Sequence, residues 1–174
     1  VTGRGTGIDD VMLVHLRFPA SIRVKFKAGQ HLNLILDNGE RRDFSMANPP
    51  RESDGAQLHI RHVPGGAFTS HVFEKLARGD RLKLEVPFGD FTLRDSDRPI
   101  LFVAGSTGFA PIKSIVEDMF IKNVRRDMTL YWGARTRGGL YSDLPRKCAA
   151  QNPHFKYVPV ISDAPEPGVR HNLV

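Results

Sequence analysis

Two short strings in the first half of the chain combine a cation, aromatic rings, hydroxyls and paired glycines. The first is Arg42-Asp43-Phe44-Ser45, and the second is His62-Val63-Pro64-Gly65-Gly66-Ala67-Phe68-Thr69. On a strand, Arg42 and Phe44 share one face and Ser45 points to the other. The guanidinium could then reach a phosphate while the ring packs along a bound cofactor. By itself, the first string fits an edge strand with a surface arginine equally well.

The second string adds a glycine loop to this strand. Gly65 and Gly66 let the backbone approach a ligand closely, and Thr69 is predicted to be the N-cap of a helix over 69–77. Free N–H groups and the positive end of the helix dipole would converge where a diphosphate can sit. A plain turn and cap is the alternative for this string alone. Both strings in this order favour a noncovalently bound flavin. The Ser45 hydroxyl would then donate a hydrogen bond to the flavin ring.

A third glycine-rich segment, Gly105-Ser106-Thr107-Gly108-Phe109-Ala110-Pro111, follows an apolar run and opens a predicted helix. It is neither a Gly-x-Gly-x-x-Gly motif nor a P-loop. Strand–loop–helix units of this kind commonly bind nucleotide phosphates at the carboxyl end of a sheet. Glycines needed only for a tight turn are an equal alternative. Farther along, Arg135 and Arg137 end the next predicted strand. They could hold a dinucleotide's phosphates or ribose, and exposed loop arginines are an equal alternative.

Antiparallel strands are predicted to position the first two strings. The first ninety-odd residues alternate apolar and polar side chains, which is typical of strands with one buried face. Asn38-Gly39 predicts a tight hairpin before Arg41. The pattern fits a barrel or a sandwich. The side chains predicted to face inward are Met12, Val14, Leu16, Phe18, Leu32, Leu34, Leu36, Leu58, Ile60, Leu82, Leu84 and Val86.

The pattern changes after Arg98-Pro99, where we expect a second domain to begin. The continuous apolar run 100–104 predicts a strand buried on both faces of a parallel sheet. Pro111 suits the first turn of a helix. The predicted buried stripe of that helix consists of Ile112, Ile115, Val116 and Met119.

Two further strands, over 128–132 and 157–161, flank a predicted helix over 141–150. The resulting β-α-β-α-β order indicates right-handed crossovers and a parallel sheet. Three strands are fewer than a doubly wound domain usually has, so we expect the chain to be part of a longer protein.

Composition and charge narrow the classes of protein. The chain has 174 residues, a formal charge of +6 and one cysteine, Cys148. The positive charge suits anionic partners, but the basic residues are scattered rather than gathered in a nucleic-acid-binding stripe. A lone cysteine excludes an internal disulfide or a cysteine-ligated iron–sulfur or zinc site within the chain. His59 and His62 are predicted on opposite strand faces, which argues against a shared metal. No leader or apolar span is apparent, so we expect a cytoplasmic protein without membrane contact.

The four motifs, in this order, resemble the ferredoxin–NADP reductase superfamily, and most closely its bacterial oxygenase reductases and CDP-6-deoxy-glucoseen reductases. The resemblance covers nearly the whole chain. It implies an antiparallel six-stranded Greek-key β-barrel over 1–97, followed by a partial parallel doubly wound α/β nucleotide-binding domain over 98–174. It also implies FAD as cofactor, with FMN as the alternative, and NAD(P)H as hydride donor. The family's [2Fe-2S] module would lie on another segment or on a separate partner protein.

The resemblance also implies roles for single residues. Flavin would be contacted by Arg42, Phe44, Ser45 and the backbone around His62 and Val63, with its phosphates at Gly65, Gly66 and Thr69. Nicotinamide would be bordered by Gly105, Thr107, Gly108 and Pro111, and the rest of the dinucleotide by Arg135 and Arg137. The two expected catalytic residues are Ser45, as donor near flavin N5, and Thr107, which would orient nicotinamide. Phe44 replaces the family's commoner tyrosine, and the family's late Cys-Gly motif has no match before Val174.

These features predict a flavin-dependent NAD(P)H oxidoreductase that passes electrons to an iron–sulfur centre, on a ferredoxin-like domain or an oxygenase or dehydrase partner. The first alternative is a noncatalytic module that binds flavin or a partner through the same fold. The second is a nucleic-acid binder that exploits the basic charge, for which strongly salt-dependent DNA binding would be the signature.

Overall fold

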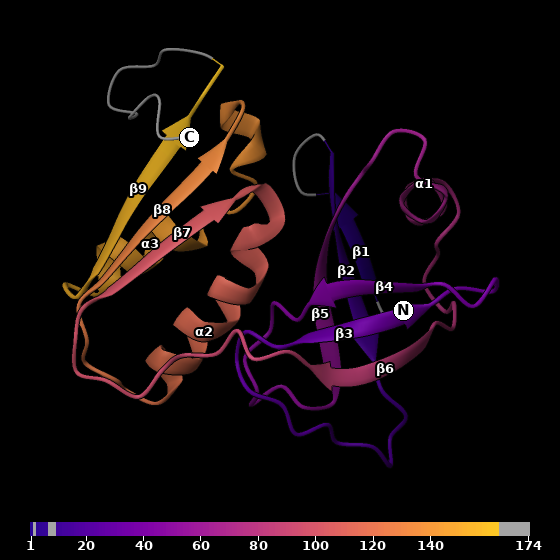
Figure 1. Ribbon diagram of the computed structural model, residues 1–174, viewed down its shortest axis with the longest axis horizontal. Coiled ribbons are helices and arrows are strands. Elements are labelled where there is room, and N and C mark those ends of the chain that lie inside the picture. Colours follow the sequence, from indigo (N-terminus) through magenta and orange to yellow (C-terminus); the bar gives the residue numbers. More distant parts are fainter. Residues whose placement is uncertain (2, 7–9, 164–174) are drawn as a thin grey trace.

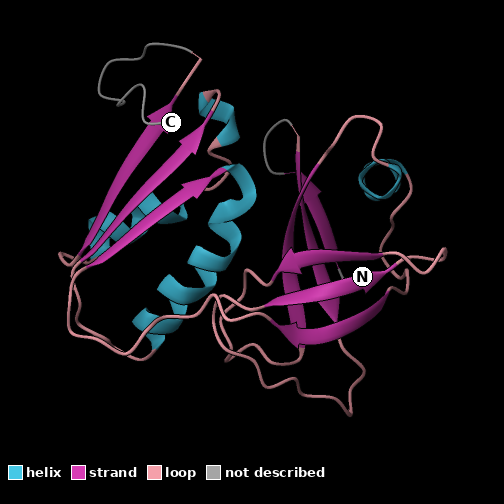
Figure 2. Ribbon diagram, in the orientation of Figure 1, coloured by secondary structure: helices cyan, strands magenta, loops and turns pink. Residues whose placement is uncertain are grey.

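The computed structural model describes residues 1, 3–6 and 10–163 of the chain. It has two lobes that lie side by side (Figure 1). Antiparallel strands form the first lobe, and a parallel sheet with helices forms the second (Figure 2). This arrangement confirms the predicted fold class. Within the described ranges, no helix has the length and apolar character needed to cross a membrane.

Six strands build the first lobe as two three-stranded antiparallel sheets, in the orders β1-β2-β5 and β4-β3-β6. Their bounds are β1 (Gly3–Thr6), β2 (Val11–Arg17), β3 (His31–Ile35), β4 (Arg41–Ser45), β5 (Gly55–Arg61) and β6 (Lys83–Phe88). Every second side chain of a strand points to the same face, so both sheets contribute to one core. That core contains the predicted inward-facing residues Met12, Val14, Leu16, Phe18, Leu32, Leu34, Leu58 and Ile60.

The predicted hairpin between β3 and β4 is confirmed. Gly39 has a φ of +83°, and its N–H donates to the Leu36 carbonyl at 2.8 Å. Glycine adopts this left-handed backbone conformation without a steric penalty. The turn sets the register that pairs Leu34 with Arg42 and His31 with Ser45 across the two strands.

The helix after the glycine loop begins earlier than predicted. Helix α1 spans Ala67–Glu74, and its N-cap is Gly66. The prediction that Thr69 is the N-cap is therefore wrong, because Thr69 already lies within the first turn. Sequence reasoning favoured the hydroxyl residue as cap, whereas the backbone turns at the glycines and the threonine side chain folds back onto the loop.

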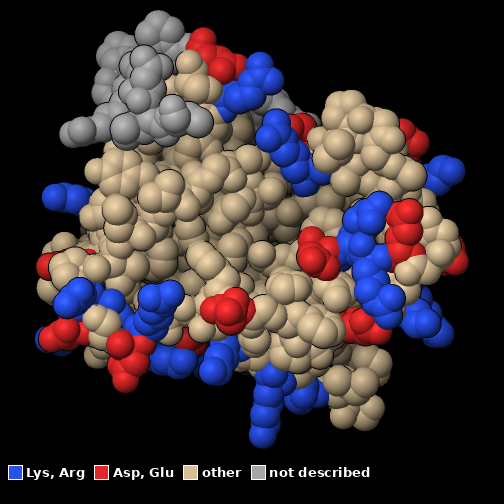
Figure 3. All heavy atoms as spheres, in the orientation of Figure 1, with Lys and Arg blue, Asp and Glu red and all other residues tan. Residues whose placement is uncertain are grey.

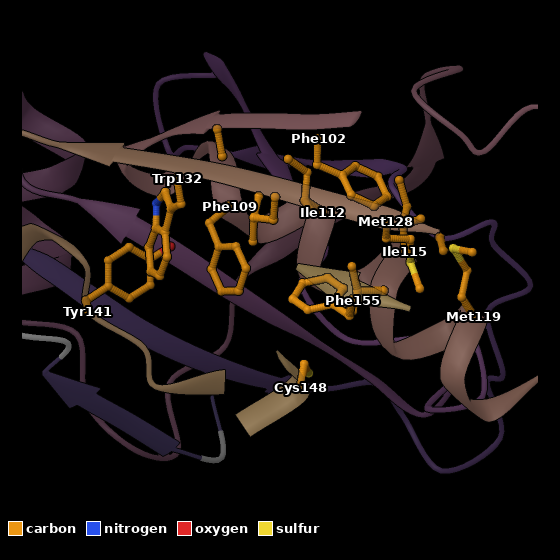
Figure 4. Close-up of a cluster of buried hydrophobic side chains, with 14 of the residues drawn as sticks. Phe102, Phe109, Ile112, Ile115, Met119, Met128, Trp132, Tyr141, Cys148 and Phe155 are labelled. Atoms are coloured by element: carbon orange, nitrogen blue, oxygen red, sulfur yellow. The ribbon is translucent and has the colours of Figure 1, made fainter. Parts of the chain in front are cut away.

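The second lobe has the predicted β-α-β-α-β order. Strands β7 (Ile100–Gly105), β8 (Met128–Ala134) and β9 (Phe155–Ile161) form a parallel sheet, with α2 (Phe109–Ile121) and α3 (Leu144–Gln151) as crossover helices. The short 3-10 helices η1 (Ser106–Gly108) and η2 (Arg137–Gly139) follow β7 and β8. The predicted stripe of α2 is buried, as are Trp132 and Cys148, in a single core between the helices and the sheet (Figure 4).

One face of β7 is exposed, contrary to the prediction that this strand is buried on both faces. Leu101 and Val103 are 65% and 72% exposed, whereas Phe102 and Ala104 are buried. The reason is that α2 and α3 contribute to the same core and therefore cover the same face of the sheet. The opposite face, toward the viewer in Figure 3, carries few charged side chains over β7 to β9.

Candidate functional site

Strand β4 carries the first predicted string at the edge of its sheet. The Arg42 guanidinium donates to the Glu40 carboxylate at 2.6 Å, and half of each side chain is exposed. A guanidinium has five N–H donors, so this pair leaves donors for a phosphate. The Phe44 ring centroid lies 5.5 Å from that of Phe68 in α1, so β4 contacts the glycine-loop string. Ser45 is half-buried at the end of the strand.

The Thr69 hydroxyl closes the glycine loop. It accepts a hydrogen bond from the Val63 N–H at 3.1 Å and lies 3.1 Å from the Val63 carbonyl and 3.2 Å from the Gly66 carbonyl. A Cβ on Gly66 would lie 2.9 Å from the Thr69 hydroxyl oxygen and 3.0 Å from the Val63 carbonyl oxygen. Gly66 is therefore required by the loop's own packing. The structure thus brings Val63, Gly66 and Thr69 together through contacts within the chain, and their binding of a flavin and its phosphates stays a prediction.

Two other loop residues, Gly65 and His62, differ in how far the rest of the chain covers them. Gly65 has a φ of +77° and open space where a Cβ would lie. The His62 imidazole is half-buried, with Nε2 3.4 Å from the Ser70 hydroxyl and its ring centroid 5.0 Å from that of Phe73. The backbone at Gly65 is therefore uncovered by neighbouring atoms, just before the N–H groups that begin α1.

The glycines of the 105–111 segment differ from Gly66 of the glycine loop, because the packing of the chain does not require them. Gly105 and Gly108 have φ values of −113° and −58°, which any residue adopts. A Cβ on either glycine would meet nothing within 4 Å. Neither backbone conformation nor packing within the described chain requires glycine there. A ligand lying against the backbone at the carboxyl end of the sheet would require it.

Ser106 and Pro111 define the shape of this segment. Ser106 has a φ of +47°, a left-handed conformation that is uncommon outside glycine. Its carbonyl accepts a hydrogen bond from the Trp132 indole at 2.9 Å. Pro111 lies in the first turn of α2, as predicted. Thr107 lies within η1, between the strand end and the helix.

The two arginines after β8 lie at the carboxyl edge of the sheet. Arg135 donates to the Asp163 carboxylate at 2.8 Å, and Arg137 begins η2. Both placements agree with a role at this edge. The part of these two arginines in binding a dinucleotide stays a prediction.

The lobes are joined beside the predicted site by residues that the sequence did not single out. The Lys113 ammonium donates to the Ala47 carbonyl at 3.1 Å, and the Ser114 hydroxyl donates to the Asn48 carbonyl at 2.7 Å. These bonds connect α2, whose first residues belong to the 105–111 segment, to the chain just after Ser45. On the other side of the junction, the Arg61 guanidinium lies 3.5 Å from the Ser106 hydroxyl.

A buried polar pair also crosses the junction. His59 Nδ1 lies 2.8 Å from the Tyr141 hydroxyl, 82 residues away, and His59 is only 7% exposed. Burial, reinforced by the Lys113 and His15 charges, lowers the pKa of His59 to about 3. Burial also raises the pKa of Tyr141 above its usual range. Both groups are therefore neutral. The alternation along β5 places His59 on the other face of the strand from Leu58 and Ile60. No sequence signal therefore marked His59 as buried.

The described residues fit FAD and a nicotinamide dinucleotide. The first lobe carries the exposed Arg42 guanidinium and the open backbone of Gly65, and the second carries two glycines, Gly105 and Gly108, that the packing of the described chain does not require. Phosphates favour guanidinium and backbone N–H donors of this kind. This fold and these residues define the class of two-lobed nucleotide-binding proteins.

The chain belongs to the family of oxidoreductase FAD-binding domains, which residues 6–93 match. Residues 102–171 match the oxidoreductase NAD-binding domain. These matches confirm the expected relation to the ferredoxin–NADP reductase superfamily and the expected FAD- and NAD-binding domains.

Two curated relatives belong to bacterial multicomponent systems. The chain is 51% identical over 158 residues to terephthalate 1,2-dioxygenase, reductase component 1, of Comamonas sp., an alignment that covers 88% of this chain and 46% of the relative. It is 40% identical over 154 residues to CDP-6-deoxy-L-threo-D-glycero-4-hexulose-3-dehydrase reductase of Yersinia pestis, with the same two coverages. The chain thus spans about half the length of the curated relatives it matches.

A solved structure supports the same relation. The cytochrome P450 reductase GcoB of Amycolatopsis superposes with a TM-score of 0.90 at 34% sequence identity. The superposition covers 98% of this chain and 53% of that one. The similarity therefore includes both lobes of the described structure.

Proposed function

We propose that this chain forms the cofactor-binding part of an FAD-dependent NAD(P)H reductase. The observation that carries the proposal is the pair of glycines at 105 and 108, because neither the backbone conformation nor the packing of the described chain requires glycine there. The FAD-binding unit would span 1–97 and the NAD(P)-binding unit 98–174. The family membership supports this reading, and no observation favours the noncatalytic alternative.

FAD, when bound, would supply a hydride acceptor that returns electrons one at a time. Arg42 would bind its phosphates together with the backbone of Gly65 and Gly66, while Phe44 and Val63 would pack against its apolar parts. The Ser45 hydroxyl would donate a hydrogen bond near flavin N5. His62 and Thr69 would hold the loop in place.

The proposed site has two walls: β4 with the glycine loop of the first lobe, and the 105–111 segment of the second. On the second wall, Thr107 would orient the nicotinamide above the backbone of Gly105 and Gly108. Pro111 would fix the start of α2, and Arg135 and Arg137 would hold the rest of the dinucleotide. No protein acid or base has to move a proton in a hydride transfer, so these residues would act by positioning and by excluding water.

The electron acceptor would be an iron–sulfur centre, on a ferredoxin-like domain or on an oxygenase or dehydrase partner. The names of the relatives, a dioxygenase reductase and a dehydrase reductase, support this part of the proposal. A supply of NAD(P)H would place the activity in the cytoplasm.

The proposal is tested by cofactor titration followed by turnover. Purified protein is titrated with FAD and, separately, with FMN, and the complex is then assayed with NADH or NADPH and ferricyanide as a one-electron acceptor. We expect tighter binding of FAD than of FMN and steady acceptor reduction. Folded protein that binds neither flavin would refute the proposal.

A further inference from the structure

A continuous set of contacts connects β5 of the first lobe to the loop after β7 of the second. It starts at the His59–Tyr141 hydrogen bond of 2.8 Å. The Tyr141 ring then meets Trp132 edge-on, with centroids 5.1 Å apart and planes at 89°. Trp132 is fully buried and donates its indole N–H to the Ser106 carbonyl at 2.9 Å.

Packing fixes the orientation of the indole in this set. Phe109 stacks on Trp132 with a centroid distance of 4.2 Å and an interplanar angle of 21°. Figure 4 shows Tyr141, Trp132 and Phe109 grouped at one end of the core, away from Met119. Tyr141 packs edge-on against the same indole, so a change in its position would shift one of the rings that hold Trp132 in this orientation.

The loop at the end of this set needs external support. Ser106 holds a left-handed backbone conformation that an L-residue avoids unless its surroundings impose it. The indole hydrogen bond to its carbonyl is one such constraint, and the 3.5 Å contact of Arg61 with its hydroxyl is another. Both constraints originate in, or are braced by, β5.

We propose that Tyr141 is a positioning residue, which transmits the position of β5 through Trp132 to the Ser106–Thr107 backbone. The inference rests on the proposed function, in which that backbone forms the nicotinamide wall and β5 belongs to the flavin-binding lobe. The His59–Tyr141 bond would help to fix the distance between the two walls, together with the hydrogen bonds of Lys113 and Ser114 to the first lobe. Neither residue touches the reacting atoms.

The first test uses the protein without cofactor and follows amide hydrogen exchange of the peptide covering 105–109. Tyr141→Phe removes the hydroxyl and keeps the ring. We expect exchange in this peptide to be about tenfold faster than in the wild type. The matched control is Tyr157→Phe, because the Tyr157 ring also neighbours Trp132, at 6.5 Å, and no described hydrogen bond links it to β5. Equal exchange in wild type and Tyr141→Phe would overturn the proposal.

The second test uses FAD-loaded protein and rapid mixing with NADH or NADPH. For Tyr141→Phe we expect FAD affinity within about twofold of wild type and flavin reduction slowed about tenfold, since small misplacements of reacting groups are costly. Tyr157→Phe should match the wild type in both measurements. Unchanged flavin reduction in Tyr141→Phe would overturn the proposal. If the wild type bound no FAD, the proposed function would fail, while the exchange test would still decide whether Tyr141 holds the loop.

His59 provides an independent check of the same connection. His59→Asn keeps a polar atom near the position of Nδ1, whereas His59→Leu does not. We expect His59→Asn to keep exchange at 105–109 as slow as in the wild type. We expect His59→Leu to show the faster exchange of Tyr141→Phe. Identical behaviour of the two variants would show that the polar contact does not carry the effect, and would overturn the proposal.

Discussion

The Ser114 hydroxyl donates a 2.7 Å hydrogen bond to the Asn48 carbonyl, 66 residues away in the chain. Ser114 is fully buried and Asn48 is 2% exposed, so water cannot replace either partner. The bond connects α2, which begins with the 105–111 segment, to the chain three residues after Ser45. The two walls of the proposed site therefore share a rigid attachment.

Ser114→Ala should destabilise the protein. It leaves the Asn48 carbonyl buried without this donor, which costs about 1–3 kcal/mol. Chemical denaturation followed by fluorescence of the only tryptophan, Trp132, measures the loss. Ser96→Ala is the control, because its hydroxyl accepts only an exposed turn hydrogen bond from the Arg98 N–H among the described contacts. Equal stability of the two variants would contradict the attachment described above.

Arg42→Met should weaken FAD binding, and Arg41→Met should not. Both are arginines of β4, but Arg41 forms a two-pronged pair with Glu85 on β6, whereas Arg42 pairs with Glu40. Loss of a charge-assisted hydrogen bond to phosphate costs about 1.5–3 kcal/mol, or roughly ten- to a hundredfold in affinity. Calorimetric titration with FAD separates the two variants. A similar loss in both would mean that Arg42 has no specific contact with the cofactor.

Gly105→Ala should leave the fold intact and impair nicotinamide binding. A Cβ there meets no atom within 4 Å and the backbone conformation tolerates alanine. The contrasting substitution is Gly29→Ala, which would place a Cβ 2.0 Å from the Phe91 carbonyl at a φ of +95°. We expect a melting temperature near wild type for Gly105→Ala and a large decrease for Gly29→Ala. A wild-type KM for NAD(P)H in Gly105→Ala would argue against a ligand on this backbone.

His59 should make the protein less stable in acid. Its pKa falls from 6.5 to about 3 on folding, so between these pH values the unfolded chain binds a proton that the folded chain does not. Stability then falls as pH falls through this window, by up to about 1.4 kcal/mol per pH unit. Denaturation of wild type and His59→Asn at several pH values measures this contribution. Parallel pH profiles of the two proteins from pH 6.5 downward would contradict a buried neutral histidine.

Local sequence signals were sufficient for the elements of each lobe. Period-two alternation predicted the strands of the first core, the Asn38-Gly39 hairpin followed from its turn chemistry, and the stripe along α2 followed from helical spacing. The errors came from tertiary context. Thr69 is not a cap because Gly66 is the N-cap of α1, and β7 is open on one face because α2 and α3 both pack on the other.

The junction between the lobes could not be predicted from the sequence. The alternation along β5 predicts that His59 faces solvent, whereas rings of the second lobe, Tyr141 and Phe109, cover it in the structure. Lys113 and Ser114 look like polar residues on an exposed helix side, yet both donate to carbonyls of the other lobe. Such contacts depend on how the lobes pack, which no local pattern encodes.

The central claim is that β4 and the 105–111 segment form two walls of one redox site. The most direct measurement mixes FAD-loaded protein anaerobically with NADH or NADPH and follows the flavin absorption. We predict that the wild type is bleached, and that Ser45→Ala and Thr107→Ala still bind FAD but are bleached about tenfold or more slowly. Bound FAD that stays oxidised with both nucleotides, or variants that react at the wild-type rate, would contradict the claim.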